Sequence, residues 1–222
     1  MIHETIPIQE KGSEAYARMC TYFWDHTEEI PIDERPVILI CPGGGYHRTT
    51  DREAEAVAVR LMSMGFHTAV LWYSVAPAHF PVALTETARA VSILRERAKE
   101  WHIDSGRIVV MGFSAGGHLA ASYGVFWNEP FVADAIGCKA ELLRPNGLLL
   151  GYPVITSKEA YWHEGSFRNL LGENPSKELL EKVALEEQVG AQTPKTFLWH
   201  TFADDTVPVE NSMLWVQALL KH

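Results

Sequence analysis

Short runs of apolar residues alternate along the chain with longer segments in which apolar residues recur every three or four positions. Runs such as VILIC and IVVMGF are continuously hydrophobic, which is typical of strands buried on both faces of a parallel sheet. The longer segments have the period of helices that bury one face. The pattern predicts an α/β fold: a mostly parallel central sheet with helices on both faces.

Turn residues and changes of period set the expected boundaries. We predict strands at 15–23, 37–41, 67–73, 107–113, 147–152 and 196–200, and helices at 51–64, 84–101, 115–127 and 209–222. The segment at about 157–190 is polar, contains glycines and ends in a charged, helix-like stretch, KELLEKVALEEQ at 177–188. We expect it to form a cap-like insertion over the edge of the sheet. The length favours one domain, 1–222.

Composition narrows the classes of partner. Lys and Arg number 19 against 28 Asp and Glu, a net charge of −9, which would repel a nucleic-acid backbone. No apolar run is long enough to span a membrane, and no basic, then apolar N-terminal signal is visible. Cys20, Cys41 and Cys138 lie far apart, so they suggest neither a disulfide framework nor a metal site. We expect a cytoplasmic protein that binds neither nucleic acid nor membrane.

The strongest chemical signal is the sequence GFSAGG at 112–117, a G-x-S-x-G motif centred on Ser114 between a predicted strand and a predicted helix. A sharp strand-to-helix turn strains the backbone at the serine, so small residues must flank it. The hydroxyl is then exposed at the carboxyl end of the sheet, beside a helix N-terminus that favours negative charge. The motif predicts a nucleophile, with a glycine-rich turn and capping serine as the alternative.

A second glycine cluster, PGGGY at 42–46, follows the predicted strand 37–41. Consecutive glycines cost chain entropy but let bare backbone amides approach a ligand, as an oxyanion hole requires. A phosphate-binding loop is the competing interpretation, but neither of the usual phosphate or dinucleotide glycine patterns is present. A plain turn is the third possibility.

An acidic pair, Asp204 and Asp205, follows the predicted strand 196–200 downstream of the serine. In serine hydrolases with the chain order Ser, Asp, His, this position holds the acid that orients the imidazole. Either aspartate qualifies on position alone, and an Asx turn that ends the strand is the alternative.

Together these motifs resemble the α/β-hydrolase superfamily, specifically the small acetylesterase and xylan-acetylesterase-like carboxylesterases related to the hormone-sensitive-lipase group. The resemblance runs through ILICPGGGYH, MGFSAGGHLAA and FLWHTFADDTVPVENS. It implies a serine carboxylesterase for short-chain, above all acetyl, esters, with no cofactor and no metal. It further implies that Ser114 is the nucleophile, that Asp204 is the triad acid, and that the oxyanion donors are the amides of Gly44, Gly45 and Ala115.

The sequence departs from that family after Asp204. The family's catalytic histidine lies beyond one further strand, whereas the predicted helix 209–222 takes up the rest of this chain. We therefore expect a truncated product without a triad base, or an unusual substitute, and a nearly inactive 222-residue form. His118, His163, His200 and His222 are the substitutes considered, and none is favourably placed.

Aromatic residues near the motifs bear on the substrate. Tyr46 and Trp162 are expected to contact a sugar ring or a small acyl group, although core packing is the plainer role for aromatics. The expected ligand is a small-molecule ester, possibly of a carbohydrate. The apolar strand 196–200 would be a sheet edge that supports a homodimer. Two other functions stay open: a non-catalytic binding protein on a hydrolase scaffold, and a transacylase or thioesterase.

Overall fold

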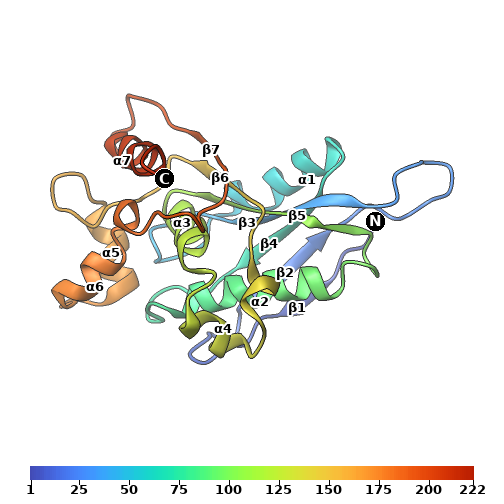
Figure 1. Cartoon of the computed structure of the whole chain (residues 1–222), viewed down its shortest axis with the longest axis horizontal. Helices are drawn as coiled ribbons and strands as arrows, with labels where there is room; N and C mark the ends of the chain where they lie inside the picture. The colour runs from blue at the N-terminus through green and yellow to red at the C-terminus, as the bar shows by residue number, and fades with distance from the viewer.

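A seven-stranded sheet runs through the molecule in the order β1-β2-β4-β3-β5-β6-β7 in the computed structural model, which describes residues 1–222 (Figure 1). The strands are β1 (Thr5–Pro7), β2 (Arg18–Tyr22), β3 (Arg35–Cys41), β4 (His67–Trp72), β5 (Ile103–Phe113), β6 (Gly147–Gly151) and β7 (Thr196–Trp199). Strands β3 to β7 pair in parallel, and β1 and β2 add an antiparallel edge. The predicted α/β class is confirmed.

Alternate side chains of the central strands enter two separate cores. Val37, Leu39 and Cys41 of β3 belong to a large apolar cluster, whereas Ile38 and Ile40 belong to a smaller one. Successive strand residues point to opposite faces, so one hydrophobic run fills both cores. α2 (Val82–Glu96) and α3 (Ala115–Phe126) pack on the large cluster, and α1 (Glu55–Ser63) packs on the small one.

Several short elements escaped the periodicity analysis. They are β1, the helices α4 (Pro130–Ile136) and α5 (Glu164–Leu171), and the 3₁₀ turn η2 (Ala140–Leu143). Their lengths give too few turns for a period to be visible. The predicted helix 51–64 begins with the 3₁₀ turn η1 (Asp51–Glu53), and the helix-like stretch at 177–188 forms α6 (Lys177–Lys182) and the 3₁₀ turn η3 (Leu185–Glu187). Local signals do mark α4, which starts at a proline and ends before Gly137 in the left-handed conformation, φ +72°.

The segment 157–190 folds into α5, α6 and η3 and packs on the main core. Phe167, Leu170 and Val183 are buried in the large cluster. The Asn169 side-chain amide donates to the carbonyl of Gly45, 2.8 Å away. The segment therefore braces the glycine loop that follows β3.

Strand β7 and the following helix α7 (Glu210–Leu219) leave apolar side chains in solvent at the end of the sheet. Phe197 is 63% exposed, Phe202 81% and Leu220 82%. Unpaired strand edges of this kind are templates for association. None of the helices has both the length and the apolar character needed to cross a bilayer.

Candidate active site

Ser114 occupies the sharp turn between β5 and α3. Its backbone has φ +51° and ψ −121°, a conformation that costs a non-glycine residue on the order of 1–3 kcal/mol. Two neighbouring segments hold it there: its N–H donates to the carbonyl of Gly151, and its carbonyl accepts from the N–H groups of His118 and Val154, at 3.0–3.1 Å. A strained serine backbone that is fixed by hydrogen bonds in this way is characteristic of the turn that carries the nucleophile in serine hydrolases.

The glycines around Ser114 are required by backbone contacts. A Cβ on Gly112 would lie 2.0 Å from the carbonyl oxygen of Gly116, and one on Gly116 would lie 2.1 Å from the carbonyl oxygen of Cys41. Real Cβ atoms do not approach backbone so closely. The first turn of α3 can therefore pack against both β5 and the end of β3 only because these side chains are missing.

The glycine loop after β3 lies against this turn. Gly44 and Gly45 have φ +134° and +65°, and a Cβ on Gly43 would lie 3.1 Å from Cβ of Ser114. The amide nitrogens of Gly44 and Gly45 donate no hydrogen bond within the protein. The amide of Ala115 opens α3, where helices have no internal acceptor for it. Gly44 and Gly45 line the same pocket as Ser114, and Ala115 follows Ser114 directly in the chain.

Glu53 is a buried carboxylate beneath the glycine loop that sequence reasoning missed. Its Oε2 accepts from the N–H of Gly43 and the hydroxyl of Thr50, both at 2.7 Å, and its Oε1 accepts from the hydroxyl of Tyr152 at 2.9 Å. Burial, reinforced by Glu53, raises the pKa of Tyr152, so this phenol stays protonated as a donor. The T-x-x-E spacing of Thr50 and Glu53, typical of a helix start, was the available signal.

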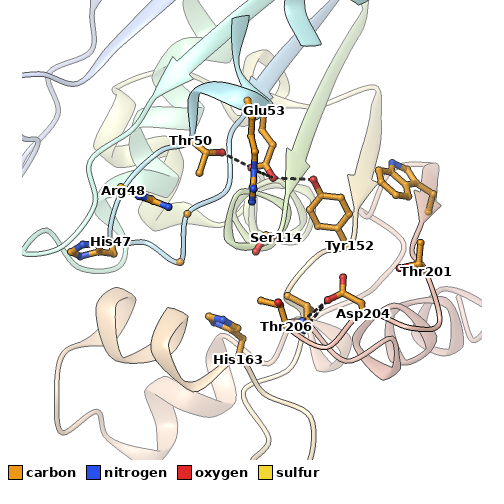
Figure 2. Close-up of a pocket in the computed structure, with 15 residues that line it drawn as sticks. His47, Arg48, Thr50, Glu53, Ser114, Tyr152, His163, Thr201, Asp204 and Thr206 are labelled. Atoms are coloured by element: carbon orange, nitrogen blue, oxygen red, sulfur yellow. Dashed lines mark hydrogen bonds and ion pairs between the residues drawn. The ribbon is translucent and has the colours of Figure 1, made fainter. Parts of the chain in front are cut away.

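A pocket of about 630 Å³ opens over Ser114 at the carboxyl ends of β3, β5, β6 and β7 (Figure 2). This is where parallel sheets generally bind ligands, because the loops of several strands converge there. The lining is mostly polar: Gly44, Gly45, His47, Arg48, Thr50, Arg52, Glu53, Ser114, Tyr152, His163, Trp199, Thr201, Asp204, Thr206 and Val207.

Asp204, and not its neighbour Asp205, lines this pocket. Its Oδ1 accepts from the N–H groups of Thr206 and Val207 at 3.0 and 2.9 Å, and its Oδ2 lies 3.3 Å from Nε2 of His200. Burial acts to raise the pKa of Asp204, but the hydrogen bonds from Val207 and Thr206, together with His200, outweigh it and hold the pKa below its usual value. Asp204 is therefore an anion in the neutral range.

This lowered pKa predicts a pH-dependent contribution to stability. Because the folded state prefers the ionised form, the contribution of Asp204 is complete above its unfolded pKa, about 3.9, and is lost as the pH falls through the folded value. The difference in free energy of unfolding between wild type and Asp204→Asn, measured in urea, should be constant from pH 7 to about pH 5 and shrink below that. A difference that stays unchanged down to pH 2 would contradict the assignment.

No histidine ring forms a hydrogen bond with Ser114. His118 is buried, with Nδ1 2.9 Å from the hydroxyl of Tyr46 and Nε2 3.1 Å from the carbonyl of Val183, and burial lowers its pKa to about 4. His200 has its Nδ1 2.7 Å from the hydroxyl of Ser212. Its Nε2 faces the carbonyl of Val207 and the carboxylate of Asp204. Both rings are fully engaged by the scaffold.

Two other histidines line the pocket. His47 lies on the glycine-loop side, and His163 lies opposite it at the start of α5 (Figure 2). Nδ1 of His163 lies 2.9 Å from the hydroxyl of Ser166 and 3.2 Å from its N–H, so this nitrogen is engaged within α5. His222 ends the chain beyond α7.

The structure corrects the expected substrate contacts. Tyr46 is 2% exposed, and its hydroxyl is bonded to His118 in the core, so it does not face the pocket. Trp162 packs beside Phe167 and lines a separate, smaller cavity. The aromatic walls of the pocket are instead Tyr152 and Trp199, whose rings meet edge to face with centroids 5.0 Å apart. No three His, Cys, Asp or Glu side chains converge as a metal site would require.

Comparisons with known proteins agree with this geometry. The BD-FAE family model matches residues 27–219. The crystal structure of an acetyl ester-xyloside bifunctional hydrolase from Caldicellulosiruptor lactoaceticus is 36% identical with a TM-score of 0.85, covering 99% of this chain and 82% of that one. MGS-M1, an alpha/beta hydrolase from a Medee basin deep-sea metagenome library, is 33% identical with a TM-score of 0.75, covering 100% and 77%.

Curated relatives are longer proteins. Endo-1,4-beta-xylanase B of Butyrivibrio fibrisolvens is 39% identical over 204 residues, which is 87% of this chain and 30% of that protein. The acetylxylan esterase of Xylanibacter ruminicola is 28% identical over 176 residues, or 78% and 34%. The chain therefore spans about a third of the length of these relatives.

Proposed function

Because the chain belongs to the BD-FAE family of α/β hydrolases, we propose that it carries the active site of a carboxylic ester hydrolase with Ser114 as nucleophile. One observation carries the proposal. The strained backbone of Ser114 sets this residue in a pocket beside the glycine loop, where the amides of Gly44 and Gly45 have no partner in the protein. Free amides beside a nucleophile are what a tetrahedral oxyanion needs.

The proposed reaction follows the usual course of acyl transfer. The Ser114 hydroxyl attacks the ester carbonyl, and the charge on the carbonyl oxygen is held by the amides of Gly44, Gly45 and Ala115. The alcohol leaves, and water releases the acid from the acyl-enzyme. Asp204, an anion in the pocket, is placed to orient an imidazole that accepts the serine proton.

The base is the missing part within these 222 residues. Neither His47 nor His163 is hydrogen-bonded to the serine, and the rings of His118 and His200 are bonded to other groups. We propose that the 222-residue form turns over slowly for this reason. The same observation supports the second candidate function, a binding protein on a hydrolase scaffold, which would recognise esters without cleaving them.

We propose acetyl esters of carbohydrates as the substrate class. Relatives named acetylxylan esterase and acetyl ester-xyloside hydrolase support it. The mostly polar pocket, with Tyr152 and Trp199 as aromatic walls, also suits a sugar ring better than a long acyl chain.

Imidazole added to the assay tests the function, since it can supply the missing base. Hydrolysis of 4-nitrophenyl acetate is expected to rise with imidazole above the rate of imidazole alone, and to fall from acetyl to butyryl to octanoyl esters. Release of acetate from acetylated xylo-oligosaccharides, measured in the same way, tests whether carbohydrate esters are substrates. Ligand binding without any protein-dependent hydrolysis, at every imidazole concentration, would favour the binding protein instead.

The exposed edge supports a homodimer. Phe197, Phe202 and Leu220 would be removed from water if two β7 strands paired across a two-fold axis. We expect light scattering to give a mass that rises from monomer to dimer with concentration, and a Phe197→Glu, Phe202→Glu variant to stay monomeric. Wild type that remains monomeric at millimolar concentration would contradict the dimer.

A further inference from the structure

A second hollow adjoins the Ser114 pocket. It has a volume of about 340 Å³ and is lined by the consecutive residues 48–52, none of them apolar. Arg48, Thr50 and Arg52 line both this hollow and the pocket over Ser114. A ligand held in the pocket can therefore extend a polar group between the two arginines.

Both guanidinium groups are available to a ligand. Arg48 forms no ion pair and no side-chain hydrogen bond, and Arg52 is 81% exposed and comes only within 3.7 Å of Glu53. The carboxylate of Glu53 is engaged by its three hydroxyl and amide donors. Asp51, on the same segment, forms no ion pair with either arginine.

Several other arginines of the protein form close ion pairs with carboxylates. Arg89 pairs with Glu10 at 2.5 Å, and Arg97 pairs with Glu4 at 2.9 Å. Buried or binding-site guanidinium groups generally form bidentate hydrogen bonds with a carboxylate or a phosphate. Arg48 has no such anion within the protein, and Arg52 has only the 3.7 Å approach of its Nε to Glu53.

The arginines also have a defined place relative to the reacting atoms. The N–H of Arg48 donates to the carbonyl of Gly44 at 3.2 Å, and the N–H of Thr50 donates to the carbonyl of Gly43 at 3.0 Å. The segment is thus tied to the loop that carries the oxyanion amides. Figure 2 shows Arg48 extending from this segment toward the pocket that holds Ser114.

The geometry points to an anion subsite, in which Arg48 and Arg52 bind a carboxylate carried by the ester substrate. The inference rests on the proposed function and narrows it to esters that bear an acid group on their alcohol or acyl portion. A protein with a net charge of −9 repels such esters in general. Two arginines at the pocket would overcome that repulsion locally and favour binding of esters that carry an acid group.

Equilibrium binding to the Ser114→Ala form of the 222-residue chain tests the subsite without turnover. Two matched pairs of ligands are titrated by NMR. On the alcohol side, 4-acetoxybenzoate is compared with its methyl ester, and on the acyl side monomethyl succinate is compared with dimethyl succinate. In at least one pair the anionic member is expected to bind about tenfold more tightly, and the preferred pair identifies the side of the ester that carries the acid.

Variants assign the preference to the arginines. Arg48→Gln and Arg52→Gln should each reduce the preference for the anionic ligand, and the double variant should abolish it. Arg48→Lys should retain part of the preference, because lysine keeps the positive charge but lacks the planar guanidinium group. Arg60→Gln, which removes an exposed charge on α1 outside both cavities, should leave it unchanged. The preference should also weaken with ionic strength.

Two results would overturn the subsite: equal affinity for both members of both pairs, or a preference that survives in the double variant. Either result would bear only on recognition of the acid group and not on the proposed esterase function. Failure of the proposed function is recognised separately, by the absence of acyl transfer from 4-nitrophenyl acetate to Ser114 in the parent chain.

Discussion

Ser114→Ala is expected to abolish formation of an acyl-enzyme, whereas the parent chain should carry one acetyl group after exposure to 4-nitrophenyl acetate with imidazole. Alanine keeps the turn but removes the hydroxyl that lines the pocket together with Gly44 and Gly45, whose amides have no partner in the protein. In complete triads the loss of the serine costs on the order of 10⁶ in kcat. Because no histidine ring is hydrogen-bonded to Ser114, the covalent adduct is the sharper measurement, by intact mass and peptide mapping.

Two variants serve as controls for that experiment. Ser122→Ala removes a buried hydroxyl of α3 that has no hydrogen-bond partner, and it should leave acetylation unchanged. Ser114→Cys should still be acetylated, because a thiol depends less on a general base than a hydroxyl does. If the adduct persisted in Ser114→Ala, or mapped only to surface lysines, Ser114 would not be the nucleophile.

Glu53→Leu is expected to lower the free energy of unfolding by about 2–4 kcal/mol, because three donors lose their acceptor and each buried unsatisfied donor costs roughly 1–3 kcal/mol. The N–H of Gly43 is the most affected, since it lies in the interior, whereas Thr50 and Tyr152 border the pocket and can turn to water. Acetylation of Ser114 should fall as well, because the oxyanion loop loses its support. Urea unfolding and the acetylation rate measure the two effects.

Glu53→Gln is the matched control. Its amide oxygen can accept from Gly43 and Thr50, and its amide nitrogen can donate to the hydroxyl of Tyr152, so most of the network survives without the charge. We expect stability close to that of wild type. Equal losses in the Leu and Gln variants would mean that the negative charge, and not the hydrogen bonding, is what this site requires.

Local patterns predicted the sharp turn at Ser114 and the glycine loop after β3, because both features depend on neighbours in sequence. The turn at Ser114 needs glycines two residues away on either side, and the glycine loop needs its three residues in a row. Both features lie directly after buried strands, which the hydrophobic runs marked. Parallel pairing of β3 with β5 then brings the two loops together.

The substrate contacts were not predictable in the same way. Tyr46 directly follows the glycine loop yet turns into the core toward His118, which leaves pocket contacts to Tyr152 and Trp199 from two other strands. Adjacency in sequence says nothing about which side of a loop a ring faces. The spacing of Thr50 and Glu53 marked a helix start, but the contacts of Glu53 with Gly43 and Tyr152 join residues 10 and 99 positions away and were not visible in it.

The sequence by itself determined the α/β class, the turn at Ser114, the glycine loop, and an acidic residue after the last strand. Each of these is specified by residues a few positions apart, where backbone sterics and burial period act. Only the tertiary structure decided that Asp204 and not Asp205 enters the pocket, that Glu53 supports the glycine loop, and that Arg48 and Arg52 line the pocket over Ser114. Those outcomes depend on packing between distant segments, which local patterns do not encode.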